Sequence, residues 1–341
     1  MSTLTPRATT PTRTPSTPPR ARRRPPLGVV VAAVGVLAVV SLFVGVSTVT
    51  PATLLAQDAQ ALLVLLVSRL PRTLAVLLAG AAMAVAGMIM QMLARNRFVE
   101  PSTAGTVESA VLGILVVTVL SPGAPLMVKM LVASTFALAG TALFLRLLAF
   151  VPLRSVLVVP LVGLMLGGVI GAVTTFFAYR LDLLQSLASW TTGDFSGVLR
   201  GRYELLWITL ALTVVAYLAA DRFTLAGMGS DLTTNLGMSY RTVMTLGLVI
   251  VSMVSAVVVV TVGVIPFLGL VVPNVVSLML GDNMRRTAPW VAVLGAGFVL
   301  VCDLVGRVVR HPYEVPVGVV VGVVGSALFL ALLLRRGSRA A

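Results

Sequence analysis

The chain has 341 residues, of which 58% are hydrophobic and 11% are charged, and its net charge is +14. Its mean hydropathy is +1.06. Soluble domains average about 45–50% apolar and about 25% charged residues, so a soluble globular protein is excluded and a polytopic membrane protein is indicated. In a soluble protein such a charge would suggest nucleic-acid binding. Here the arginines lie between apolar runs, where they set membrane topology, so we expect no nucleic-acid partner.

Cysteine and histidine are scarce. Cys302 is the single cysteine and lies in an apolar run, and His311 is the single histidine. A disulfide framework and a thiolate metal site are therefore excluded. A channel for bare Zn²⁺ or Mn²⁺ would be expected to show more imidazole or clustered carboxylate. We expect neither a resident metal nor a cofactor.

The N-terminal segment, residues 1–27, is rich in Pro, Thr, Ser and Arg. This composition predicts a disordered tail. The apolar run that follows, residues 28–48, is too long for the core of a secretory signal and lacks a convincing cleavage site, so a retained first helix is favoured over a signal peptide. Four arginines within residues 20–24 place the N-terminus in the cytoplasm.

Apolar runs predict an all-α protein with about ten transmembrane helices. After the first run they lie at about residues 73–93, 103–120, 126–148, 155–178, 203–219, 242–262, 266–280, 288–305 and 316–334. We expect residues 28–336 to form one transmembrane permease domain and residues 337–341 a cytoplasmic tail. Two short mixed segments, 57–67 and 181–202, are predicted to lie on the outer face.

The basic residues give this topology a test. Alternation from a cytoplasmic start puts seventeen of the 25 basic residues inside and eight outside, which is the bias that the positive-inside rule requires. Both termini are then in the cytoplasm, and the protein is a multi-pass protein of the cytoplasmic membrane. An odd number of crossings would spoil the pattern.

The longest polar cytoplasmic insert follows the sixth crossing, at residues 221–241. Gly229, Ser230 and Asp231 supply a break and a helix cap, so two short helices with an apolar face are predicted. Connections in helix bundles usually run to about 2–8 residues. An insert of this length that carries an apolar face predicts a cytoplasmic partner.

Two further features concern the last three crossings. Pro266, Gly269 and Pro273 each weaken a helix, and Pro273 removes an amide donor in mid-span. Such broken backbone survives in a membrane only where protein or a cavity surrounds it. Asp303 and Arg307 lie four residues apart at a membrane boundary, a spacing that fits a local helix brace and a docking role equally well.

These residues resemble a known family. The runs RLPRTLAVLLAGAAMAVAGMIMQMLARNRFVEPSTAG, WTTGDF, VIPFLGLVVPNVV, DLVGR and EVPVGVVVGVVGSALFLALLL occur in the order seen in FecCD-type permeases, the membrane subunits of bacterial ABC importers for iron–siderophores, haem and cobalamin. The resemblance covers about residues 57–336. It is greatest to permeases for ferric catecholate-type siderophores such as petrobactin, vibriobactin and anguibactin. Most of the family has Pro-His where this chain has Pro273-Asn274, a mark of that branch.

The resemblance implies the type II ABC importer fold and a set of partners. These are a second permease chain in a homo- or heterodimer, a cytoplasmic ATPase dimer, and an extracytoplasmic siderophore-binding protein, with a ferric siderophore as substrate. It further implies that Arg69, Arg72 and Arg307 contact glutamates on the two lobes of the binding protein. The predicted topology independently places all three on the outer face.

The resemblance also assigns roles at the cytoplasmic face. Residues 221–240 match the coupling helices that sit in a cleft of the ATPase. The positions carried over are Asp221, Leu225, Gly229, Asp231, Leu236 and Gly237. The turn from Asn96 to Phe98 resembles part of the cytoplasmic gate.

Three other functions compete with this interpretation. The rival within the family is a haem or cobalamin permease. A proton-coupled secondary carrier would need ionisable residues in mid-membrane, and the one plausible candidate, Glu108, fits a helix N-terminal carboxylate equally well. An intramembrane enzyme is disfavoured because no His/Asp/Glu cluster falls within the crossings. The single lysine, Lys129, does not belong to a P-loop, so ATP must be hydrolysed by another chain.

Overall fold

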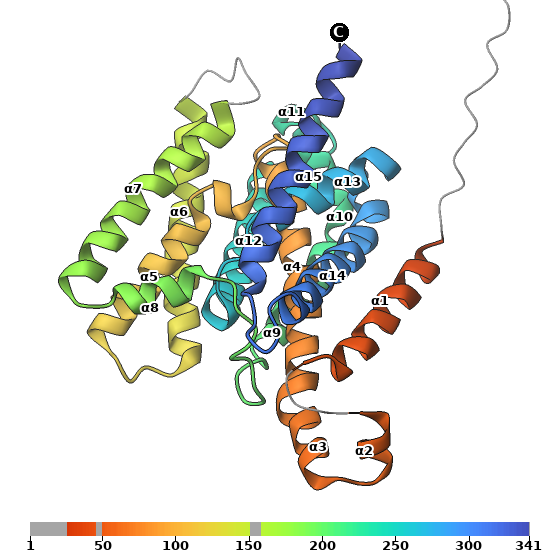
Figure 1. Ribbon diagram of the computed structural model, residues 1–341. Helices are drawn as coiled ribbons and strands as arrows, with labels where there is room; N and C mark the ends of the chain where they lie inside the picture. Colours follow the sequence, from red (N-terminus) through yellow and green to blue (C-terminus); the bar gives the residue numbers. More distant parts are fainter. Residues whose placement is uncertain (1–25, 46–49, 151–157, 341) are drawn as a thin grey trace, which may run out of the picture.

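The computed structural model describes residues 26–45, 50–150 and 158–340. The predicted disordered tail, apart from its last two residues, lies outside the described residues. Within them all regular structure is helical (Figure 1). The helices are α1 (Leu27–Phe43), α2 (Pro51–Leu55), α3 (Ala59–Val64), the π-helical turn η1 (Leu65–Arg69), α4 (Leu70–Leu93), the 3-10 turn η2 (Pro101–Thr103), α5 (Thr106–Leu120), α6 (Leu126–Phe150), α7 (Val158–Arg180), α8 (Leu184–Thr191), α9 (Leu206–Leu218), α10 (Ala220–Gly227), α11 (Ser230–Asn235), α12 (Tyr240–Val262), α13 (Leu268–Leu280), α14 (Met284–Val308) and α15 (Val317–Ala340).

The described helices fit about ten spans. Six are long and apolar enough to cross a membrane, and the pair α9 and α10, bent by 65°, makes a seventh if it counts as one span. Three shorter apolar helices are α1, α5 and α13. The all-α polytopic architecture predicted from the sequence is confirmed.

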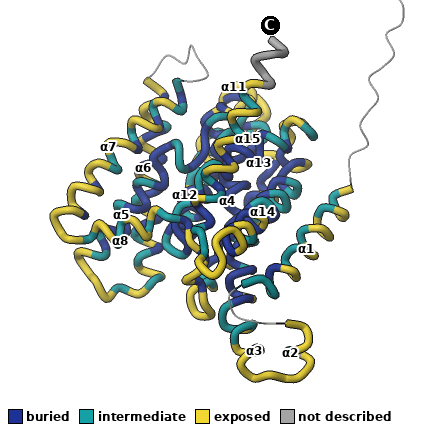
Figure 2. The backbone as a smooth tube through the Cα atoms, in the orientation of Figure 1, coloured by how far each residue is buried: buried dark blue, intermediate teal, exposed yellow. Residues whose placement is uncertain are grey.

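The helix α4 forms the centre of the bundle, and most of its side chains are buried (Figure 2). It packs against α9, α12, α13 and α14. Lipid supplies no hydrophobic drive to helix association, so close backbone contact through small residues must supply it. A Cβ on Gly80 would lie 2.8 Å from the carbonyl oxygen of Gly295 in α14, and the α-carbon of Gly269 in α13 blocks the same position on Gly87.

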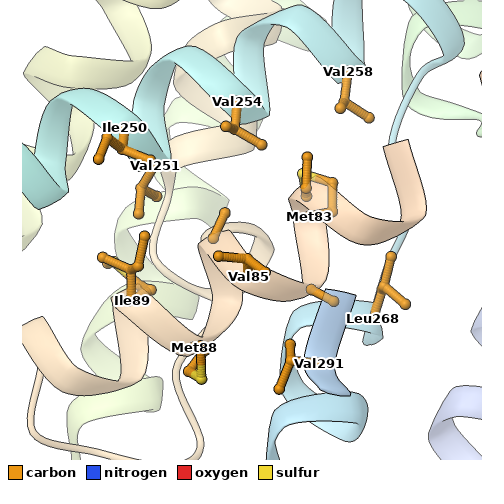
Figure 3. Packing of buried hydrophobic residues seen from close by; sticks show 14 of the residues in the cluster. Met83, Val85, Met88, Ile89, Ile250, Val251, Val254, Val258, Leu268 and Val291 are labelled. Atoms are coloured by element: carbon orange, nitrogen blue, oxygen red, sulfur yellow. The ribbon is translucent and has the colours of Figure 1, made fainter. Parts of the chain in front are cut away.

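Larger side chains fill the space around these contacts. Figure 3 shows α4 between α12 on one side and α13 and α14 on the other. Among the labelled residues of this cluster are Met83, Val85, Ile89, Val251, Val254, Leu268 and Val291. Burial of apolar atoms in this core and the glycine contacts together fix the distances between the central helices.

A second group of helices lies to one side. In Figure 1, α5 to α8 stand left of the central bundle, and α7 is the outermost helix. A small cluster of α5, α6 and α12 residues attaches this group to the centre, and Leu187 and Trp190 of α8 pack against it. Only four residues of α7 beyond Val159 are buried, namely Gly163, Gly167, Thr174 and Ala178, and they form one stripe toward α5.

The polar insert forms α10 and α11 with a break at Met228–Gly229, which confirms the two predicted short helices. Pro273 lies inside α13 and is buried, so the helix that it weakens is surrounded by protein, as predicted. The chain is also irregular over residues 263–267, where Phe267 takes a left-handed conformation with φ 61°.

Segment 57–67 is not a separate piece. Residues 59–93 form one continuous helix through α3, η1 and α4. Its first turns, with α2, project from one end of the bundle in Figure 1, while α11 lies near the opposite end beside the C-terminus.

The glycine contact between α4 and α13 can be tested by substitution. We expect Gly87→Ala to lower the free energy of unfolding by about 1–3 kcal/mol, because the new methyl group meets the backbone of Gly269. Gly168→Ala is the matched control, since no atom lies within 4 Å of a Cβ at this position on α7. Thermal unfolding of both variants in detergent measures the difference; equal melting temperatures would contradict the packing described.

Candidate functional site

Three arginines predicted to dock a partner lie together at one end of the bundle. Arg69 closes η1, Arg72 is in the first turn of α4, and Arg307 is in the last turn of α14. Their exposed fractions are 6%, 7% and 2%. The structure thus brings together three residues that are up to 238 positions apart in the sequence.

Two carboxylates neutralise part of this charge. Asp303 accepts from Arg72 at 2.8 and 3.1 Å and also pairs with Arg307. Glu314 accepts from Arg72 at 2.6 Å. The helix brace between Asp303 and Arg307 is therefore confirmed, as part of a larger network. No local pattern announces Glu314, since 242 positions separate it from Arg72.

Carbonyl groups at the end of α1 accept hydrogen bonds from two of the arginines. Arg307 donates to the carbonyl oxygens of Ser41 at 3.0 Å and Val44 at 3.1 Å, and Arg69 donates to Val44 as well. Carbonyls in the last turn of a helix have no partner within the helix and carry its partial negative charge. The arginines therefore cap α1. Gly45 lies so close to the guanidinium group of Arg69 that a Cβ there would overlap it.

The predicted gate turn is tied to α13. The Asn96 side chain accepts from the amide of Phe98 at 2.9 Å, and the Phe98 ring meets Phe329 of α15 edge-on at 5.9 Å. Asn274 of α13 donates to the carbonyl of Arg97 at 2.7 Å. This hydrogen bond links the turn to α13.

The polar groups left by the irregular backbone are also paired. Glu100 is 2% exposed and accepts from the amide of Phe267 at 2.9 Å, just before α13 begins. Pro273 cannot donate to Gly269, and the side chain of Gln91 donates to that carbonyl instead at 3.1 Å. Sequence reasoning missed Glu100. Its signal was Glu-Pro-Ser-Thr, in which Glu100 and Thr103 form a capping box at η2.

The insert exposes apolar side chains. Leu236 is 56% exposed, Met228 64% and Leu232 39%. Asp221 pairs with Arg285 of α14 at 2.5 Å, which fixes α10 to the bundle. The hydroxyl of Thr233 donates to Leu225 at 3.1 Å and joins α11 to α10.

Of the other residues predicted for the insert, Gly229 has φ 123° and Gly237 has φ 79°, so these two glycines allow the turns on either side of α11. Asp231 is exposed in its first turn.

A cavity of about 490 Å³ lies between the gate turn and the insert. Its walls include Asn96 and Arg97 of the turn, Thr224 and Gly227 of α10, and Asp282 before α14. The ion pair between Arg97 and Asp282 crosses this region. The turn and the insert therefore share a boundary, through which a movement of one can reach the other.

This arrangement of apolar helices, buried ion network and two-helix insert is that of a membrane permease. The chain belongs to the FecCD transport family, whose model matches residues 31–335. Among its relatives, the petrobactin import system permease protein YclN of Bacillus subtilis is 48% identical over 301 residues, which are 88% of this chain and 95% of that protein. The ferric-anguibactin transport system permease protein FatD of Vibrio anguillarum is 43% identical, over 88% of this chain and 95% of that protein.

A solved structure shares the fold. An inward-facing metal-chelate type ABC transporter matches with a TM-score of 0.78 over 91% of this chain and 98% of that one, at 23% identity. The chain is a permease subunit of an ABC importer rather than an enzyme, and it passes through the inner membrane several times. Partners of two kinds are implied, an ATPase and a substrate-binding protein.

The buried carboxylate is expected to matter more than an exposed one. Asp303→Asn leaves two buried guanidinium groups with one carboxylate fewer. We expect it to lower the free energy of unfolding by about 3–5 kcal/mol. Asp282→Asn removes an exposed ion pair and should cost less than about 1 kcal/mol. Thermal unfolding in detergent compares the two. A similar loss in both variants would show that burial of the network adds nothing.

Proposed function

We propose that this chain is the membrane subunit of an ABC importer that carries a ferric siderophore across the cytoplasmic membrane. The observation that supports it most is the 48% identity, over nearly the whole chain, to a petrobactin import permease. ATP hydrolysis in a partner subunit drives the movement. We place both termini in the cytoplasm, residues 28–336 in the permease domain, and a second permease chain beside this one.

The arginine network is the proposed docking site for the binding protein. It lies at the opposite end of the bundle from α11, as a receptor site and a motor site must. Two carboxylates and the carbonyl groups at the end of α1 accept hydrogen bonds from these three guanidinium groups. A glutamate of the binding protein can take the place of the Val44 carbonyl or of Glu314.

The insert of α10 and α11 is the proposed contact with the ATPase. Exposed apolar side chains on a cytoplasmic segment gain free energy when a partner covers them. ATP binding closes the ATPase dimer and shifts the insert. The shared cavity carries the shift to the gate turn around Asn96 and Phe98, and the path opens alternately to the two sides.

Competition for uptake tests the cargo. We expect unlabelled ferric catecholate siderophores to reduce uptake of a radiolabelled ferric catecholate by cells that express the complete importer, while haem and cobalamin leave it unchanged. Cobalamin is the strongest rival, because vitamin B12 permeases of Yersinia are 34% identical over 78% of this chain. Transport without the ATPase and the binding protein would overturn the proposal in favour of a secondary carrier.

Mutations at the docking site should impair receptor binding without affecting assembly with the ATPase. Arg69→Gln keeps a donor for Val44 but removes the charge, and we expect it to weaken binding of the receptor protein at least tenfold while the ATPase still assembles. Arg180→Gln, at the end of α7, is the control for loss of an outer charge. Receptor binding is measured by surface plasmon resonance on importer in nanodiscs. Unchanged receptor binding in Arg69→Gln would show that the arginines cap α1 and do not dock the binding protein.

A mutation in the insert should impair association with the ATPase and leave receptor binding unchanged. Leu236→Asp places a charge on the exposed apolar surface and should prevent copurification of the ATPase without changing receptor binding. Leu199→Asp is the control, because Leu199 is also exposed, at 41%, but lies outside the insert. ATPase that still copurifies with Leu236→Asp would exclude this surface as the contact.

A further inference from the structure

Glu108 is an acid in the lateral group of helices α5 to α8, and the proposed transport mechanism gives it no role. It lies in the first turn of α5. A Cβ at Gly167, midway along α7, would lie 3.2 Å from its carboxyl carbon. Because α7 spans the membrane from Val158 to Arg180, this contact places the carboxyl group near mid-membrane. The missing side chain at Gly167 provides the room for it.

Glu108 is among the residues that line a cavity of about 400 Å³ between α5, α7 and α8. These helices are neighbours at the left of Figure 1. The walls are mainly apolar, with Val107, Val111, Leu184 and Leu187 among them. Their polar groups are few, namely Glu108 and three threonines, Thr174, Thr175 and Thr191.

The polar atoms around this cavity are mostly acceptors. The carboxyl oxygen Oε2 of Glu108 is buried and has no hydrogen-bond partner among the described residues. The hydroxyl of Thr174 donates to Ile170 at 2.8 Å, and that of Thr191 donates to Leu187 at 2.9 Å, so both retain only lone pairs. A cavity lined in this way selects a ligand that donates hydrogen bonds.

The charge of Glu108 has no counter-ion in the described part of the chain, where no arginine or lysine pairs with it. Glu100, another buried acid, is held by the Phe267 amide and supplies no positive charge. Ionisable groups at membrane depth are costly unless they are paired, and they mark paths for substrates and ions. One carboxylate matches a single positive charge, whereas hard divalent cations take several oxygen ligands.

We propose that this cavity binds an organic ammonium group of the transported chelate, with Glu108 as its counter-ion. The assignment rests on the proposed function and names a chemical feature of the cargo. A charged N–H group pairs with the Glu108 carboxylate and donates to the threonine lone pairs, and the apolar walls contact the alkyl chain that bears it. The volume suits one arm of a chelate, and Glu108 thereby contributes to selection among ferric chelates.

Transport of matched cargoes tests this assignment. Importer reconstituted with its ATPase and binding protein is offered one ferric catecholate that bears a free amine and the same chelate with the amine acetylated. We expect Glu108→Gln to lower uptake of the amine form at least tenfold relative to wild type, and to leave the acetylated form unchanged. The same binding protein serves the wild-type and the variant importer. Any preference of the binding protein for one chelate therefore affects both importers equally and drops out of the comparison.

Two variants serve as controls. Glu108→Asp keeps the charge and should retain most of the preference for the amine, which a purely structural role in packing would not explain. Glu204→Gln makes the same chemical change on the exposed loop before α9 and should have no effect. An amine-to-acetyl uptake ratio that is the same in wild type and Glu108→Gln would overturn the assignment.

A binding experiment is independent of transport. The melting temperature of the purified importer is measured with butylammonium chloride and with sodium chloride at equal ionic strength. We expect butylammonium to raise it in wild type and Glu204→Gln but not in Glu108→Gln. An equal response in all three would overturn the ammonium site. Absence of uptake of both chelates by wild type, together with a shift specific to Glu108, would instead overturn the siderophore cargo and keep the site.

Discussion

At the contact between Gly87 and Gly269, two helix backbones approach so closely that neither residue has room for a side chain. This approach puts the start of α13 within reach of Gln91 and Glu100, which pair backbone groups that no helix pairs. In lipid no water is available to hydrogen-bond such groups, so irregular backbone is tolerated only where other protein groups supply the hydrogen bonds. The gate turn, the break at residues 263–267 and the position of α13 all depend on this contact.

The same helices connect the two proposed working ends of the permease. The helix α4 carries Arg72 in its first turn and leads at its other end into the turn of Asn96 and Phe98. The helix α14 carries Arg307 in its last turn and begins beside Asp221 of the insert. The helices α4 and α14 also make the most extensive helix contact of the described residues, so one packed pair joins the two ends.

Much of this could be read from the sequence, because the membrane imposes strong local signals. Uninterrupted apolar runs predicted the long helices. The break and helix cap at Gly229, Ser230 and Asp231 predicted the two short helices of the insert. What could not be read were pairings between distant positions, such as Arg72 with Glu314 or Glu100 with Phe267, since nothing local specifies them. The donor that Pro273 removes could be predicted, but not its replacement, because Gln91, which donates to the Gly269 carbonyl, is far away in the sequence.

The arginine cap on α1 has a consequence for biosynthesis. The Ser41 carbonyl receives its hydrogen bond from a residue 266 positions later, so this contact can form only after α14 has been synthesised. Arg69, 25 positions after Val44, is available much earlier as a donor for the same end of α1. During synthesis Arg307 therefore completes a cap that Arg69 can begin.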